Sequence, residues 1–183
     1  MHYIFDTSSL LALTRYFIPF DNNEKLKLLF KQLINKDIII IDKVIEESRF
    51  VSNGAILKSL NYLNDKNHST STSNIIPTKE FITKLETDDF CYPVQRKKLN
   101  SPQFEQHKRI FLNSADSWLI LYCIEHNKQL YQNIIVTEET KTNNDKKLFK
   151  KIPSICQSLN IQTCSLTDYF KDHLKIQLSN YLK

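Results

Sequence analysis

Short continuous apolar runs alternate along the chain with longer segments whose apolar residues recur at helical spacing. Four short segments predict strands, at residues 3–5, 38–41, 134–137 and 161–164, and the four isoleucines at 38–41, without polar alternation, predict a parallel strand that is covered on both faces. Capping residues and helical spacing predict helices from Ser8 or Ser9 to about Phe17, from Asp21 or Asn22 to about Asn35, from Asp42 past Glu47, from about Ala55 to Asp65, from Thr78 to about Thr87, from about Gln103 to Leu112, from Ser114 over ADSWLILYCIEHN, and from Thr167 to about Tyr181. This alternation, without a repeat period, predicts an α/β fold.

We expect a three-layer α/β/α sandwich around a central, mostly parallel sheet of four to five strands. The 183 residues suit a single domain over 1–183, with residues 51–113 as a helical insertion or lid region. Within that region, HSTSTSN at residues 68–74 is low in hydrophobicity and predicts an exposed loop.

The amino-acid composition argues against several classes of protein. The single glycine, Gly54, leaves neither a GxGxxG nor a Walker A loop, which argues against kinases, ATPases and Rossmann dehydrogenases. No apolar run approaches the roughly 18 residues of a membrane helix. The four cysteines show no CxxC spacing, and the sequence opens without a basic leader. A cytoplasmic protein with reduced thiols and no membrane contact is therefore expected.

Acidic residues follow three of the predicted strands or begin the helices beside them. Asp6 ends the first strand, and Asp116 lies in the first turn of the helix that leads into the third. The remaining acids form two pairs, Glu46 with Glu47 and Glu138 with Glu139. Ligand sites of parallel sheets form beyond the carboxyl ends of the strands, and carboxylate oxygens favour Mg²⁺ or Mn²⁺ over Zn²⁺.

Each of these acids also has a structural explanation. An aspartate at a strand end or in a first helical turn is favoured as a cap in any protein. Asp6, followed by small hydroxyl residues, is therefore either a helix cap or the first ligand of a metal site. The ordered set of acids, rather than one of them, indicates the metal site.

The motifs FDTSSLL, VIEES, SADSWLILYCIEH and IIVTEET occur in an order that resembles the PIN domain, the fold of VapC-type toxins and other nucleases. The segment from VTEET to KKIPSICQSLNIQTCSLTDYF is similar to a bacterial PIN subfamily with a TEE strand end and an IPxxC segment. The resemblance spans nearly the whole chain, although residues 51–113 add little to it.

The resemblance implies that Asp6, Glu47 and Asp116 bind the metal, with Glu139 as the fourth catalytic acid. Glu139 departs from the TxD pattern of many PIN nucleases by one methylene, which puts a second directly bound metal in doubt. Four further residues are expected in supporting roles: Ser8, Thr137, Glu46 and Glu138. Glu46 is the alternative to Glu47, and Ser8 either caps the helix or orients Asp6.

The resemblance further implies a Mg²⁺- or Mn²⁺-dependent endoribonuclease that cleaves RNA phosphodiester bonds with metal-activated water. A toxin of a toxin–antitoxin pair follows by analogy, with an antitoxin and a second copy of the chain as partners. The alternative is a PIN-like module, weak or inactive in catalysis, that binds RNA or protein.

The formal charge of +5 and the pI of about 8.9 permit a polyanionic partner. Four basic residues are expected to hold the RNA backbone: Lys97, Lys98, Lys108 and Arg109. A further basic cluster occurs at residues 146–151, where four of six positions are lysine.

Overall fold

The structure is a computed structural model that describes residues 1–127, 132–141 and 146–183. Its strands are β1 (His2–Phe5), β2 (Ile38–Ile39), β3 (Asn133–Val136) and β4 (Gln162–Cys164). Its helices are α1 (Thr7–Ala12), α2 (Lys25–Leu33), α3 (Asp42–Ser48), α4 (Ala55–Ser59), α5 (Lys79–Lys84), α6 (Pro93–Arg96), α7 (Ser101–Leu112), α8 (Ala115–His126), α9 (Ile152–Ser158) and α10 (Leu166–Asp168). π-Helical turns follow α1 and α10, at Leu13–Phe17 and Tyr169–His173. Turns of 3-10 helix occupy Ile18–Phe20, Val51–Gly54, Asn61–Asn64, Lys66–His68 and Leu178–Asn180.

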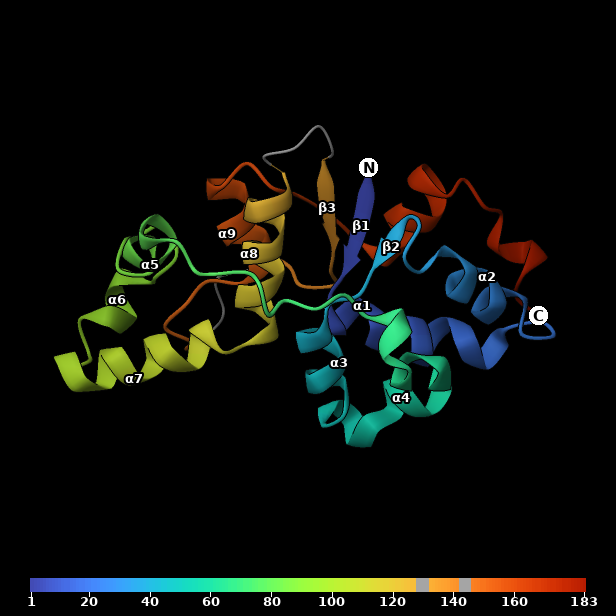
Figure 1. The fold of residues 1–183 in the computed structure, drawn as a ribbon, viewed down its shortest axis with the longest axis horizontal. Coiled ribbons are helices and arrows are strands. Elements are labelled where there is room, and N and C mark those ends of the chain that lie inside the picture. Colours follow the sequence, from blue (N-terminus) through green and yellow to red (C-terminus); the bar gives the residue numbers. More distant parts are fainter. Residues whose placement is uncertain (128–131, 142–145) are drawn as a thin grey trace.

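The four strands form one parallel sheet in the order β2-β1-β3-β4. In the register, Tyr3 lies between Ile38 and Ile134, and Val136 pairs with Phe5 and Cys164. Parallel strands need helical crossovers, which the intervening segments supply (Figure 1). The predicted α/β sandwich with a parallel sheet is confirmed.

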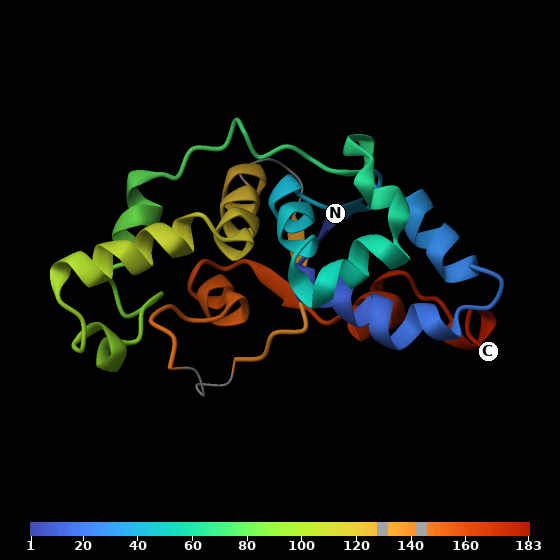
Figure 2. The same cartoon turned by 90° about the horizontal axis from the view of Figure 1, so that it is seen from below.

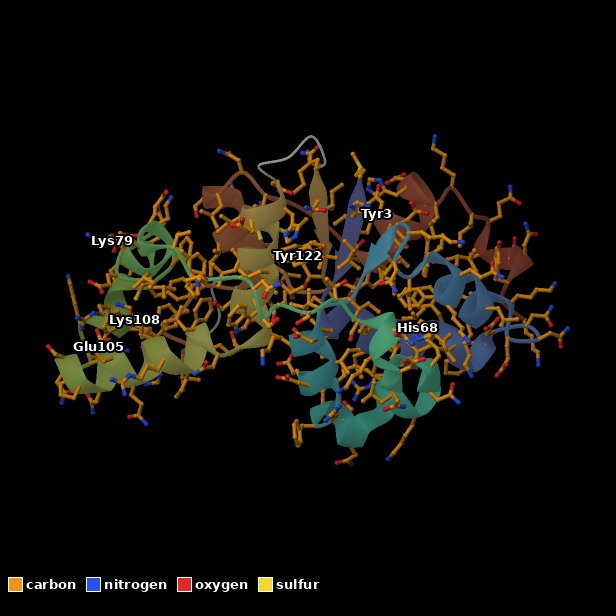
Figure 3. All side chains as sticks on the ribbon, viewed as in Figure 1. Tyr3, His68, Lys79, Glu105, Lys108 and Tyr122 are labelled. Atoms are coloured by element: carbon orange, nitrogen blue, oxygen red, sulfur yellow. The ribbon has the colours of Figure 1, made fainter. Side chains whose placement is uncertain are left out.

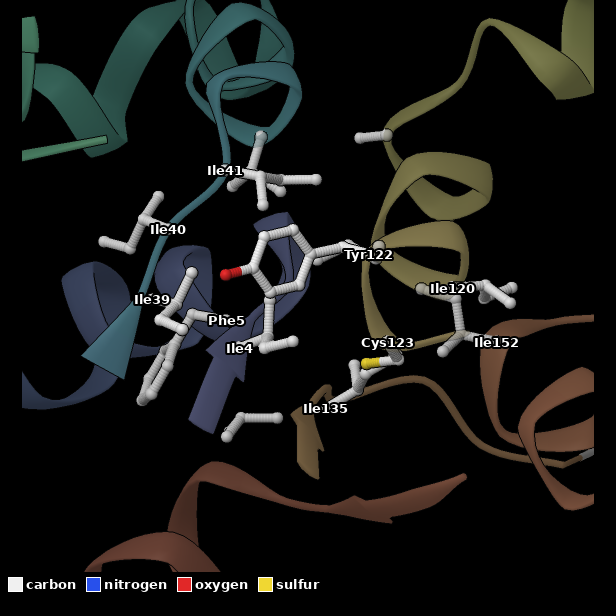
Figure 4. Packing of buried hydrophobic residues seen from close by; sticks show 14 of the residues in the cluster. Ile4, Phe5, Ile39, Ile40, Ile41, Ile120, Tyr122, Cys123, Ile135 and Ile152 are labelled. Carbon is white, nitrogen blue, oxygen red and sulfur yellow. The ribbon is translucent and has the colours of Figure 1, made fainter. Parts of the chain in front are cut away.

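Side chains of β1 alternate between the two faces of the sheet. Phe5 packs edge-on against Phe30 of α2 and Tyr169 after α10, with ring centroids 5.1 and 5.2 Å apart. Ile4 points to the opposite face, where Tyr122 extends from α8 toward the sheet (Figure 4). Burial on both faces explains why residues 3–5, 38–41 and 134–136 read as unbroken apolar runs.

Helices α5, α6 and α7 form an arm at one end of the molecule, seen in both ribbon views (Figures 1 and 2). A backbone pairing ties this arm to residues 148–150. The Tyr92 amide donates to the Leu148 carbonyl at 2.9 Å, and the Lys150 amide donates to the Phe90 carbonyl at 2.8 Å. Residues 90–92 are therefore paired with residues 148–150, and we call this pairing the brace. It connects the arm to the body, which is the sheet with its covering helices.

The expectation of an exposed loop at residues 68–74 is wrong for its centre. Thr72 is buried, and its amide and hydroxyl donate to the Asp42 carboxylate at 3.1 and 2.7 Å. Thr70 also pairs with the backbone of Ile40 and Asp42, which extends the edge of β2. The loop is thus a strap across the start of α3.

The expected C-terminal helix from Thr167 to Tyr181 forms only in its first half, as α10 and the π-helical turn Tyr169–His173. Ser165 caps it instead, since its hydroxyl accepts from the Asp168 amide at 3.1 Å in a capping box. The helical path ends at Leu174, because Lys175 takes a left-handed conformation with φ of 53°.

The four cysteines are free thiols, in agreement with the sequence prediction. Within the described ranges, no helix combines the length and apolar character required to cross a membrane.

Candidate functional site

Asp6 lies where β1 ends and α1 begins, and it is 3% exposed. It occupies the N-cap position of α1, yet its side chain makes no capping hydrogen bond. Oδ2 instead accepts from the hydroxyl of Ser8 at 2.5 Å and from that of Thr137 at 2.9 Å. Asp6 is therefore held as part of a polar site at the carboxyl ends of β1 and β3.

The two hydroxyls also anchor the segment after β3. The Glu138 amide donates to Ser8 Oγ at 3.0 Å, and the Glu139 amide donates to Thr137 Oγ1 at 3.1 Å. Because α1 begins at Thr7, Ser8 lies inside the helix, and its expected role as a cap is wrong. Its position instead orients the Asp6 carboxylate.

The two glutamates of α3 point in different directions. Glu47 is half-buried, and its Oε2 accepts a hydrogen bond from the Thr7 hydroxyl at the start of α1. Glu46 is exposed and forms an ion pair with Lys43, with 2.8 Å between Oε2 and Nζ. Of this pair, only Glu47 faces the helix that follows Asp6.

Asp116 is the second residue of α8, whose N-cap is Ser114, as the sequence predicts. Helices α3 and α8 pack against each other, so Glu47 and Asp116 approach from facing helices. Burial raises the pKa of Asp116 to about 8, with further contributions from the charges of Asp6, Glu139 and Glu47. Lys147 acts in the opposite direction.

The acids after β3 both contact helix starts. Glu139 is half-buried, and its Oε2 accepts from the Ile152 amide of α9 at 3.0 Å. Glu138 is exposed, and its Oε1 accepts from the Leu166 amide of α10 at 2.7 Å. Glu138 thus binds the start of α10. Glu139 binds the start of α9 and also interacts electrostatically with Asp6 and Asp116.

Three of the inner acids, Asp6, Asp116 and Glu139, have raised pKa values. Burial raises the pKa of Asp6, against the opposing effect of its bonds from Ser8 and Thr137. Burial also raises the pKa of Glu139, and the charge of Asp6 adds to the rise. Carboxylates that resist ionisation together are stabilised by protons or by a cation.

The donor atoms suit a hard divalent cation, since carboxylate and hydroxyl oxygens gather in a largely buried position. In the part of the chain that the structure describes, no three His, Cys, Asp or Glu side chains form a ready metal cage. Mg²⁺ rarely uses such a cage, because it retains several waters and binds through one or two carboxylates plus substrate phosphate. Asp6 and Asp116, with Glu47 and Glu139 beside them, fit this mode.

A pocket of about 400 Å³ opens next to Asp116 and Glu139. Its apolar wall includes Phe111 and Phe149, whose rings lie 4.6 Å apart. Four basic residues line it: Lys146, Lys147, Lys150 and Lys151. The sequence shows this lysine cluster, but only the brace between the arm and residues 148–150 indicates that it adjoins the acids.

The basic residues expected to hold RNA lie elsewhere. Lys108 is buried in the arm and pairs with Glu86 at 2.5 Å, so its expected role is wrong (Figure 3). Lys97 and Lys98 are exposed at the end of α6, which lies in the arm and away from β1 in both views (Figures 1 and 2). Arg109 is exposed on α7 and borders a separate surface hollow.

The family model described as "Domain of unknown function (DUF4411)" matches residues 3–177. The chain belongs to the DUF4411 family. The match begins within β1 and extends past the π-helical turn Tyr169–His173, so it includes all the acids of the site of this DUF4411 domain. No curated protein matches the chain.

Proposed function

We propose that this DUF4411 protein is a Mg²⁺- or Mn²⁺-dependent nuclease of the PIN type that cleaves RNA. The observation that carries the proposal is the gathering of Asp6, Glu47, Asp116 and Glu139 from four separate segments of the chain, since the charges of the other three all reach Asp116. Isolated helix caps would have no reason to lie this close together. A site for a divalent cation accounts for the arrangement.

In this proposal, Asp6 and Asp116 hold the cation, with Glu47 at its side. A bound divalent cation supplies the positive charge that a phosphodiester and an attacking water require. Ser8 and Thr137 keep the Asp6 carboxylate in one orientation through their hydroxyl hydrogens. Glu139 keeps one oxygen on the Ile152 amide, which leaves the other to accept a proton or a water hydrogen bond.

The test is cleavage of single-stranded RNA with Mn²⁺, measured for the wild type and for Asp6→Asn, Asp116→Asn and Glu47→Gln. Each substitution removes a charge without changing shape, and a rate loss of about 10² or more is expected. Glu46→Gln is the matched control, because Glu46 lies one residue away but pairs with Lys43 at the surface. Equal cleavage by all variants would identify a contaminant and refute the proposal.

The toxin role and the antitoxin partner follow from resemblance to VapC-type proteins and are proposed on that ground alone. Growth arrest on expression in a bacterial host, abolished by Asp116→Asn and relieved by a protein encoded beside it, is the expected result. Growth that is unaffected by the wild type would refute the toxin role without touching the nuclease. A homodimer is likewise proposed by resemblance, and light scattering tests it.

A second candidate is a PIN-like module that binds RNA or protein without cleaving it. The observation in its favour is Glu139, one of whose oxygens is taken by the Ile152 amide. Calorimetric titration with Mn²⁺ separates the two functions. A nuclease should bind the ion and lose binding in Asp6→Asn, whereas a scaffold without metal should give no heat in either protein.

A further inference from the structure

The pocket beside Asp116 and Glu139 combines three properties. It has a volume of about 400 Å³, an apolar wall and a lysine rim. Pockets of this size hold ligands that bury an apolar face while a few polar groups fix their orientation. The pocket therefore fits a ligand with one flat apolar part and one anionic part.

Lysines form the rim of the pocket, next to the acids Asp116 and Glu139. Lys146 and Lys147 are exposed, and the charge of Lys147 reaches Asp116 and Glu139. Lys150 is fixed by a hydrogen bond from its Nζ to the Asp88 carbonyl at 2.5 Å. Cations placed at one side of an acidic site attract a polyanion without neutralising the acids themselves.

The apolar wall is formed by aromatic packing and one exposed aliphatic side chain. Phe149 packs on Phe111 and Phe104 from α7, with centroid distances of 4.6 and 6.4 Å. Ile110, which also lines the pocket, is 61% exposed, whereas Phe111 and Phe149 are 9% and 8% exposed. An extruded nucleobase would cover this surface, because bases offer a flat apolar face to any wall of this kind.

We infer that this pocket holds one unpaired nucleotide of a single-stranded nucleic acid, next to the phosphate at the acids. Lys146 and Lys147 contact the backbone phosphates, and the wall formed by Ile110, Phe111 and Phe149 receives the base. The inference rests on the proposed function for the identity of the acid site. It adds a preference for single strands, since a base inside a duplex cannot enter the pocket.

The experiment is fluorescence anisotropy with labelled RNA of about 12 nucleotides, single-stranded or annealed to its complement, in EDTA so that no cleavage occurs. Lys146→Gln/Lys147→Gln is compared with the matched control Lys97→Gln/Lys98→Gln, since all four lysines are exposed. Ile110→Ser is compared with Val94→Ser, which is 67% exposed on α6.

We expect the Lys146/Lys147 variant to bind single-stranded RNA about tenfold more weakly than the wild type. The slope of log Kd against log salt should fall by about 0.7 for each phosphate contact, or about 1.4 for both. Ile110→Ser should lose about threefold, and both controls should bind as the wild type does. Duplex RNA should bind more weakly than single strands.

Equal losses in the two lysine variants, tighter binding of duplex, or competition by polyglutamate as effective as that by RNA would overturn the inference. Other results distinguish failure of the nuclease proposal from failure of this inference. RNA that binds as described and is never cleaved with Mn²⁺ would refute the nuclease and leave the pocket. Cleavage with an unchanged KM in the Lys146/Lys147 variant would refute the pocket and leave the nuclease.

Discussion

Asp6 occupies the cap position of α1, and two hydroxyls from different segments hold its Oδ2. One of these, Ser8, is local to the turn after β1. The other, Thr137, directly follows β3 and approaches only because β1 and β3 are neighbours in the sheet. This contact of Asp6 outside its own turn therefore depends on sheet order, which no local pattern specifies.

The hydroxyls should tune metal affinity without being required for the fold. Ser8→Ala and Thr137→Val are each expected to weaken Mn²⁺ binding by about tenfold, because a carboxylate without its orienting partner loses alignment. Isothermal titration calorimetry measures the change. Ser158→Ala, at an exposed hydroxyl at the end of α9, is the control and should bind Mn²⁺ as the wild type does. Unchanged affinity in both site variants would remove the orienting role.

Asp116 should make the metal-free protein less stable as pH rises. Its pKa is about 8 in the folded protein and about 3.9 in the unfolded chain. The folded protein therefore binds more protons between these values, and the free energy of unfolding falls as pH rises through that window. Asp116→Asn should match the wild type near pH 4 and exceed its stability above about pH 8.

Urea unfolding in EDTA at several pH values measures this difference. Glu46→Gln is the control and should follow the wild-type curve, since Glu46 is exposed and pairs with Lys43 at the surface. Saturating Mn²⁺ should remove the decline in the wild type, because the cation takes the place of the proton. A wild-type curve that stays flat from pH 4 to 9 would contradict the raised pKa.

At the scale of elements, the geometry of helix α3 directs Glu46 and Glu47 to different sides of the helix. Successive residues of a helix differ by about 100° in direction, so Glu46 and Glu47 cannot share a face. The start of α3 is fixed by Asp42, whose carboxylate accepts from the Lys43 amide at 2.9 Å and from Thr72 of the strap. The strap thus sets where Glu47 meets Thr7.

Asp42→Ala should lower the free energy of unfolding by about 2 kcal/mol, because it removes hydrogen bonds to a charged acceptor and leaves the buried Thr72 without its partner. Chemical denaturation measures the loss. Asp65→Ala is the matched control, because Asp65 is exposed and caps the turn Lys66–His68 through the Asn67 amide. Equal losses in the two variants would show that the strap is not anchored at Asp42.

Elements with strong local signals were predictable. The apolar runs predicted the strands, and Ser114 predicted the start of α8. The sequence did not predict the strap, because HSTSTSN forms its contacts with Asp42, which lies about 30 positions away. The long C-terminal helix failed because nothing in its apolar spacing indicates that Lys175 turns left-handed.

At the scale of the whole molecule, the body carries the acids and the arm carries one wall of the pocket. Lys108 shows that a basic residue in the sequence need not be available to a ligand, because it is buried in the arm and forms an ion pair with Glu86. The lysines at 146–151 meet the acids only through the backbone pairing with residues 90–92. Acids near strand ends follow from topology rules, whereas the surface that faces them depends on how an insertion folds back.

The central claim is that the acids converge on one divalent cation. A crystal of the wild type soaked in Mn²⁺, measured at the manganese edge, tests it directly. We predict an anomalous peak in contact with the Asp6 and Asp116 carboxylates, absent in Asp116→Asn. A peak elsewhere, or none at these two side chains under saturating Mn²⁺, would contradict the claim.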